Sequence, residues 1–269
     1  TTEIYTLSLH DALPICRLLE IVEKAFDKAK PLFSLAIYYP LASYCGPDKS
    51  IDPFDKNRQK QLVRLIRTQF LKRFESSAHA FQCSCIQLLL KLLSFAKKHA
   101  VSTADLRHIE KREARNDDVI TFTMEHVRRW QPATEEEADE DLVTPEMLEN
   151  VEELSRDEYD VDAILRETFD DMDQIVDFLK ELKKFKPRND SKLQALIKLL
   201  KEDPVLSKHK VIIFTEFADT AHYLRDELRE AGITGVDEVD SSTKRDRGDI
   251  IRQFAPYYND SSSAELAAE

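Results

Sequence analysis

The chain has 269 residues, of which 42% are hydrophobic and 33% are charged, so it can form one large domain or two ordinary ones. Its four glycines, at positions 46, 232, 235 and 248, exclude a phosphate-binding loop of the G-x-x-x-x-G-K-[ST] type, because none of them precedes a Lys. The formal net charge of −12 argues against nucleic-acid binding, but residues 133–162 hold fourteen acidic residues and one Arg, which leaves the rest of the chain near +1.

The first half of the sequence shows mainly helical spacing of apolar residues. Residues 1–15 (TTEIYTLSLHDALPI) resemble a translated adapter junction, and we expect a non-native leader there; a natural N-terminal arm is the alternative. Residues 35–41 (LAIYYPL) could form a short strand. Helices are predicted over residues 17–30, 56–74 and 78–99, and the last of these is apolar nearly all round, which predicts a buried helix. Residues 102–129 are polar and charged.

Residues 131–160 are expected to be a solvated acidic linker, because like charges at that density repel one another. A helix is predicted over residues 161–186, where apolar residues recur at alternating steps of four and three; packing against a neighbouring helix fits this spacing better than a coiled coil, because two heptads are too few.

The C-terminal residues change in character. Ser191 can cap a helix that Pro204 stops, and a continuous apolar run, Val-Ile-Ile-Phe at 211–214, is typical of a strand buried on both faces. Further elements are predicted as a helix over 218–231 that Gly232 ends, a second strand over 236–239, and a helix over 244–254. This order of strands and helices predicts a parallel sheet with covering helices.

Three segments together resemble Swi/Snf-type translocases of helicase superfamily 2. They are NRQKQLVRLIRTQFLKRFESS at 57–77, KVIIFTEFADTAHYLRDEL at 210–228 and DSSTKRDRGDIIRQF at 240–254. The first is similar to the family's helical bridge between two motor lobes, and the other two are similar to the start of the second RecA-like lobe.

The resemblance implies a mixed fold, in which a mostly α-helical N-terminal region is followed by an incomplete α/β RecA-like lobe with a parallel sheet. Residues 16–130 would form the helical bridge, and residues 161–269 the lead-in helices and the beginning of the second lobe. The intact parent would bind ATP and Mg²⁺ and move along DNA or RNA. We expect this chain to be a fragment without ATPase activity, since neither a phosphate-binding loop nor an arginine-finger motif is encoded.

The resemblance also implies that hydroxyl groups contact nucleic-acid phosphates. The candidates are Thr215, Ser241, Ser242 and Thr243, although Ser and Thr at such positions also cap the following helix, which alone would explain them.

A second group of candidates is basic. Lys60, Arg64 and Arg67 continue a stripe that begins at Lys56, and residues 56–75 carry seven basic residues and one acidic residue. Such a stripe could follow a phosphate backbone, but an ordinary solvated helix face, or an ion-pair partner for the acidic linker, is the simpler explanation.

One motif is interpreted as coincidence. Asp237-Glu238-Val239-Asp240 fits the D-E-x-D box of such motors, but no phosphate-binding loop precedes it. The seven histidines show no H-E-x-x-H spacing, so the sequence predicts no metal site; His79 and His222 are interpreted as surface or partly packed helix residues.

The remaining signals concern environment. Cys16, Cys45, Cys83 and Cys85 form no C-x-x-C pair, which favours reduced packing cysteines and a cytoplasmic location. No signal-peptide pattern and no run of ~20 apolar residues is present, so no membrane association is expected. The alternative function is a non-enzymatic helical interaction module whose acidic segment docks a basic protein partner or mimics nucleic acid.

Overall fold

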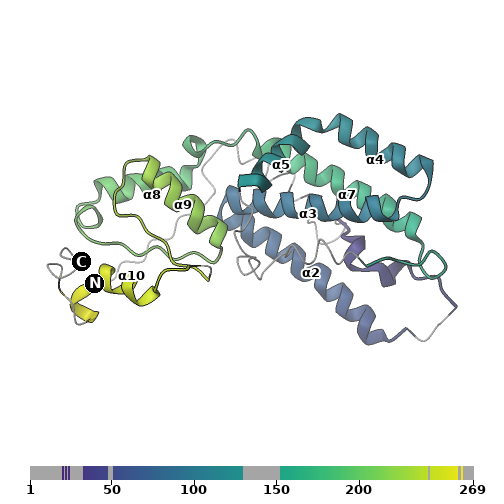
Figure 1. The fold of residues 1–269 in the computed structure, drawn as a ribbon, viewed down its shortest axis with the longest axis horizontal. Coiled ribbons are helices and arrows are strands. Elements are labelled where there is room, and N and C mark those ends of the chain that lie inside the picture. Colours follow the sequence, from purple (N-terminus) through teal and green to yellow (C-terminus); the bar gives the residue numbers. More distant parts are fainter. Residues whose placement is uncertain are drawn as a thin grey trace. The chain divides into compact units, whose positions relative to one another are not determined.

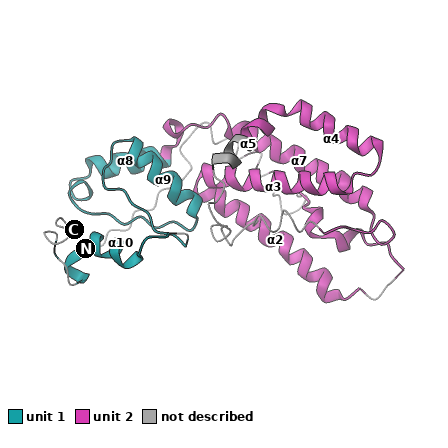
Figure 2. Cartoon of the chain, viewed as in Figure 1, with its two compact units in different colours: residues 1–7, 192–269 teal, residues 8–191 magenta. Residues whose placement is uncertain are grey.

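Serine 191 marks the boundary between two compact units of the computed structural model (Figure 2). The structure describes residues 20, 22, 24, 33–47, 51–129, 152–241, 243–259 and 262, with the side chains of 124–129 left out. We refer to the described residues up to Ser191 as the N-terminal unit and to those from Lys192 onwards as the C-terminal unit, and each is treated by itself.

The N-terminal unit is built around helix α3 (Ala78–His99), which packs against α7 (Val161–Leu182) and against α2 (Pro53–Ser76) (Figure 1). Ser77 caps α3 by accepting a hydrogen bond from the amide of Ala80, and Asp160 caps α7 in the same way through Ala163. The bounds of α3 coincide with those that its apolar sequence predicts.

The core of the N-terminal unit is largely aromatic. Phe81 on α3 contacts the rings of Phe70, Phe74 and Phe178, at centroid distances of 6.0, 5.1 and 5.6 Å. By length and composition α3 could cross a membrane, which the sequence pattern did not lead us to expect. However, 61% of its most apolar window is buried inside the protein, as in the core helix of a soluble protein.

Two further helices cover this unit and were missed from sequence: α4 (Thr103–Arg115) and α5 (Asp117–Arg129). They lie in the stretch that we interpreted only as polar. The predicted strand at residues 35–41 is also wrong, because two short 3-10 helices, η1 (Ala36–Tyr38) and η2 (Pro40–Ser43), occupy it. Pro40 lacks the amide that a paired strand would need.

The segment before α7 is anchored to the rest of the N-terminal unit at two residues, although its other side chains are exposed. Leu154 is buried, and Tyr159 forms an isolated antiparallel bridge with Tyr44, with their rings 5.3 Å apart edge to face. Residues 152–160, the end of the predicted acidic linker, therefore lie against the N-terminal unit. The more strongly acidic residues before them lie outside the described residues, as do most of 17–30 and all of 1–15.

The C-terminal unit contains three α-helices among its described residues: α8 (Ser191–Glu202), which begins at the boundary, α9 (Ala218–Glu230) and α10 (Arg247–Phe254). Short 3-10 turns occur at Leu206–Lys208 (η5) and Pro256–Asn259 (η6), and η4 (Pro187–Asn189) precedes α8. Gly232 ends α9 as predicted, with a φ of +82° that favours glycine.

The predicted parallel sheet is contradicted. About 71% of the structure is helical, and none of the described residues belongs to a strand. Residues 211–215 and 236–240 have no regular secondary structure and do not pair with each other. Ile212, Ile213 and Phe214 are exposed, Phe214 by 90%. An apolar run becomes a buried parallel strand only beside partner strands and beneath covering helices, and the described residues of this unit provide no such partners.

Candidate functional site

The candidate residues of helix α2 separate into exposed and engaged side chains. Lys56, Lys60 and Arg64 are exposed and have no ion-pair partner in the described part of the chain. Because they lie four residues apart, they occupy one side of the helix and span about 12 Å along its axis.

Arg67 has a structural role instead. It is half-buried and donates hydrogen bonds from Nη2 to the backbone oxygens of Phe33 and Ser34, which ties α2 to the segment before η1. Burial lowers the pKa of its guanidinium, while nearby Asp171 raises it. Arg67 is therefore a poor candidate for a phosphate contact.

The hydroxyl candidates lie in the C-terminal unit, and those with a hydrogen bond serve turns. Thr215 accepts a long hydrogen bond, 3.4 Å, from the amide of Phe217 at the start of α9. Thr243 donates to the carboxylate of Asp240 and accepts from the amide of Asp240, both at 2.9 Å. The backbone oxygen of Ser241 accepts from Arg247, and Ser242 lies outside the described residues. Neither residue caps the following helix, because α9 has no side-chain cap at Phe217 and Asp246 caps α10 through the amide of Gly248.

A different group of side chains converges where α9 faces the extended residues 236–240. Arg225 donates to Glu238 at 2.7 Å, and Arg229 donates to the backbone oxygen of Val236 at 2.7 Å. Side chains at positions 222, 225 and 229 share one face of a helix, because these positions are three, four and seven residues apart.

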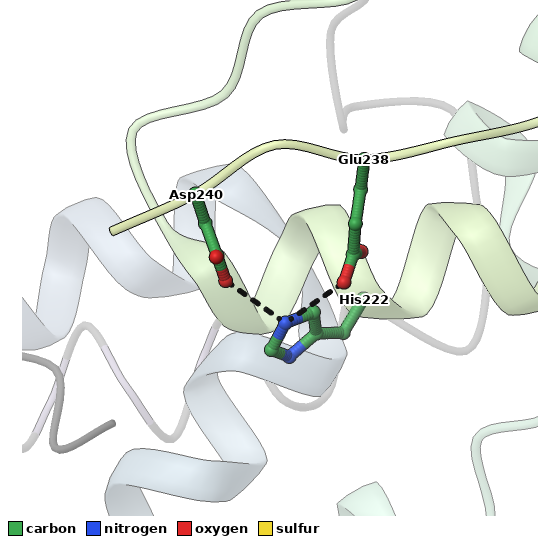
Figure 3. A group of neighbouring side chains, drawn as sticks. All are labelled: His222, Glu238 and Asp240. Carbon is green, nitrogen blue, oxygen red and sulfur yellow. Dashed lines mark hydrogen bonds and ion pairs between the residues drawn. The ribbon is translucent and has the colours of Figure 1, made fainter. Parts of the chain in front are cut away.

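The third position on this face is His222, whose imidazole lies between two carboxylates (Figure 3). Its Nε2 is 3.2 Å from Oε1 of Glu238 and 3.2 Å from Oδ2 of Asp240. Glu238 and Asp240 are two residues apart in an extended segment, so their side chains leave the backbone on the same side. All three residues are partly buried.

The charges around this cluster perturb one another. Burial raises the pKa of Glu238, and the neighbouring His222 and Arg225 oppose that change. Hydrogen bonding from Arg245 lowers the pKa of Asp237, and hydrogen bonding from Arg225 lowers the pKa of Asp226. Oε2 of Glu238 is buried and has no hydrogen-bond partner in the described part of the chain.

An open cavity of about 250 Å³ borders the cluster. It is lined by charged and polar side chains, which are Arg225, Arg229, Asp237, Glu238, Asp240, Thr243 and Arg245. Every arginine in this lining already has a partner within the unit, since Arg245 binds Asp237 and the other two make the contacts given above. An ion or small solute can reach the two carboxylates of the cluster through this cavity.

Sequence reasoning missed the cluster. From sequence, the D-E-V-D motif is interpreted as coincidence, and His222 as a surface or partly packed helix residue. The one available signal was the alternation of Glu238 and Asp240 on one side of an extended segment. The turn at residues 231–235, which carries that segment back along α9 to His222, could not be deduced from the pattern.

Comparison with protein-family models, with curated proteins and with solved structures finds no match for this chain.

Proposed function

We propose that this chain is a nucleic-acid-binding part of a larger ATP-dependent translocase, and that the outer face of α2 contacts the phosphate backbone. The observation that carries the proposal is the row of exposed cations Lys56, Lys60 and Arg64, none of which is neutralised by a described acidic residue. Phosphate contacts from Lys and Arg provide most of the affinity in sequence-independent binding.

The translocase part of the proposal rests on the three sequence segments that resemble Swi/Snf-type motors. The first of them, residues 57–77, makes up most of α2. Arg58 adds a further exposed cation to the helix, whereas Arg67 is withdrawn from the surface by its bonds to the backbone. In the parent, ATP and Mg²⁺ would be bound by residues that this chain does not contain.

The test compares two triple variants of the full chain. In the first, Lys56, Lys60 and Arg64 are changed to Ser. In the control, Arg107, Lys111 and Arg115 of α4 are changed to Ser; these are exposed, unpaired among described residues, and have the same spacing, but Asp105, Glu110 and Glu113 alternate with them. Binding of labelled single-stranded and duplex DNA and RNA is followed by fluorescence anisotropy at several salt concentrations.

We expect the α2 variant to lose about tenfold or more in affinity and to reduce the slope of log affinity against log salt by about 2–3, as the loss of three phosphate contacts requires. The α4 variant should retain most of the wild-type slope. Equal slopes in the two variants would contradict the proposal.

The acidic residues offer a second test of the same proposal. Changing the eight acidic residues between 135 and 149 to their amides leaves the packed residues 152–160 intact and removes charge that competes for α2. Binding should become stronger. Unchanged affinity would show that the acidic segment does not compete.

The interaction-module alternative is favoured by a separate observation. The C-terminal unit exposes eight of the large hydrophobic side chains: Val205, Ile212, Ile213, Phe214, Val239, Ile251, Tyr257 and Tyr258. Exposed apolar side chains in such number are typical of a surface that another protein covers. If the α2 variant binds nucleic acid as the wild type does, this alternative becomes the better explanation of the chain.

A further inference from the structure

We infer that His222, Glu238 and Asp240 form a binding site for one divalent transition-metal ion, with Zn²⁺ as the best-fitting ion. The site lies in the C-terminal unit and involves no residue of α2, so the inference is independent of nucleic-acid binding. It rests on the spacing of the three ligand atoms, on their hydrogen bonding, and on access from the cavity.

The spacing agrees with a shared ion. Two ligand atoms that bind one metal at about 2.1 Å lie about 3.0–3.4 Å apart when the angle between them is 90–109°. His222 Nε2 is 3.2 Å from each carboxylate oxygen, and the three ligand atoms all lie within 4.8 Å of one another. Small rotations of the two carboxylates would place the three ligand atoms at three corners of a tetrahedron around one ion.

Both carboxylates also accept hydrogen bonds from outside the triad, from Thr243 to Asp240 and from Arg225 to Glu238, but they share a single nitrogen of His222. Nε2 of His222 carries at most one hydrogen, and two carboxylate oxygens lie at the same distance from it. Oε2 of Glu238 is buried and has no hydrogen-bond partner among the described residues. A hydrogen on Nε2 points towards one carboxylate at a time, whereas one cation can accept an electron pair from each of the three side chains at once.

Arg225 is the competitor for Glu238, because its Nη1 lies 2.7 Å from Oε1. It also makes a two-pronged contact with Asp226, from Nε at 2.7 Å and from Nη2 at 3.0 Å. If an ion displaced it from Glu238, the guanidinium would keep this second partner. Metal binding is thus compatible with the arginine remaining paired.

The ligand set decides the class of ion. Imidazole nitrogen favours Zn²⁺ and its first-row neighbours over Mg²⁺ and Ca²⁺, which take oxygen ligands. The triad supplies three ligands, so water or an anion can bind the ion at the fourth position. The cavity beside Glu238 and Asp240 gives that position access to solvent.

Metal binding would have a structural effect as well. The triad joins α9 to the extended residues 236–240, and only four apolar side chains of the described C-terminal unit are buried: Leu193, Phe217, Leu228 and Pro256. A unit with so few buried apolar contacts gains a large share of its stability from a metal crosslink.

The test uses the full chain after treatment with a chelator and removal of the chelator. Zn²⁺, Mn²⁺ and Mg²⁺ are titrated separately by isothermal calorimetry, and thermal unfolding is measured with and without each ion. We expect one Zn²⁺ per chain, weaker Mn²⁺ binding, weakest Mg²⁺ binding, and a Zn²⁺-dependent rise in the unfolding temperature.

The variants Glu238→Gln and His222→Gln should each weaken Zn²⁺ binding at least tenfold. Their matched controls, Glu230→Gln and His209→Gln, change exposed residues of the same unit and should bind as the wild type does. Circular dichroism checks that each variant is folded. A further test needs no variant: adding Zn²⁺ to the wild type should shift the NMR resonances of the His222 ring.

Three outcomes would overturn the inference. They are no stoichiometric Zn²⁺ binding, binding that Glu238→Gln and His222→Gln leave unchanged, and binding that disappears in Cys45→Ser, which would place the ion at the exposed thiol instead.

Discussion

His99 holds the backbone of Leu154, because Nε2 of its buried imidazole accepts a hydrogen bond from the Leu154 amide at 2.9 Å. The other ring nitrogen, Nδ1, is 3.0 Å from the backbone oxygen of Phe95, to which it can only donate. The imidazole is therefore neutral, with its proton on Nδ1. This single side chain fixes the end of α3 to the segment that leads into α7.

Replacing His99 with Phe should destabilise the protein by about 1–3 kcal/mol, because the buried amide of Leu154 loses its acceptor while the ring stacking on Phe95 is kept. Urea unfolding followed by circular dichroism measures the change. His209→Phe, at an exposed position, serves as the control and should have little effect. A neutral result for His99→Phe would show that another group or water satisfies the amide.

Asp171 should make stability depend on pH. This fully buried carboxyl accepts hydrogen bonds from the amides of Ser34 and Leu35, at 2.7 and 2.6 Å, and from the Ser34 hydroxyl. Burial raises its pKa to about 6, and these bonds only partly oppose the rise. A carboxyl with a raised pKa in the folded state binds protons more tightly when folded, so its contribution is greatest below about pH 4 and is lost as the pH rises through about 6.

The expected loss between pH 4 and pH 7.5 is on the order of 3 kcal/mol from this group. Asp171→Asn cannot ionise, so the unfolding free energies of wild type and variant should change by different amounts over this interval, with the wild type losing more. Parallel pH profiles would mean that Asp171 has an ordinary pKa in the folded protein.

Lys91 is a buried base, and burial shifts its pKa in the direction opposite to that of Asp171. Its ammonium lies 4.4 Å from the centre of the Tyr38 ring, and burial lowers its pKa to about 8. At neutral pH the folded protein must accommodate a poorly solvated charge. A base with a lowered folded pKa reduces stability below that pKa, and the reduction disappears as the pH rises above its unfolded value near 10.5.

Lys91→Met should therefore increase the unfolding free energy at pH 7 by about 1–3 kcal/mol, since an apolar side chain of similar length replaces the buried charge. The gain should shrink towards pH 10. Lys98→Met, on the exposed side of the same helix, is the comparison. If Lys91→Met lowered the unfolding free energy, the interactions of the Lys91 ammonium would contribute more to stability than its desolvation costs.

Hydrogen exchange should distinguish the two units. The amides of residues 211–214 make no hydrogen bond to any described residue, whereas those of residues 88–92 lie inside α3 in the core. We expect fast exchange for the first set and slow, cooperative exchange for the second. Equally slow exchange in both sets, in monomeric protein, would show that the C-terminal unit protects residues 211–214 by pairing them.

Helices could be predicted from sequence where their buried residues are apolar and recur at helical spacing. Helix α3 is apolar nearly all round, and its predicted bounds are those observed. Helix α4 was missed because Leu106 and Ile109 are its only large apolar residues, and two such positions establish no clear period.

The two strands predicted in the C-terminal unit were wrong for a different reason. An apolar run such as Val-Ile-Ile-Phe indicates a preference for burial. Whether it forms a strand depends on neighbouring strands, which the local sequence does not reveal. The cluster of His222, Glu238 and Asp240 was not evident from sequence, because Glu238 lies 16 positions after His222 and a turn between them determines whether they meet. Lys60 and Arg64 were placed correctly on an exposed face, whereas the withdrawal of Arg67 depends on Phe33, which belongs to a distant segment.

The packing of α3 against α7 has a consequence during synthesis. The residues that cover α3 end at Leu182, so the ribosome completes them about 4–17 s after it has added His99, at 5–20 residues per second. Throughout that interval the nascent chain carries a 22-residue apolar helix that resembles a membrane span in length and composition. Chaperones and targeting factors that bind such segments therefore compete with α7 for the same surface on every molecule made.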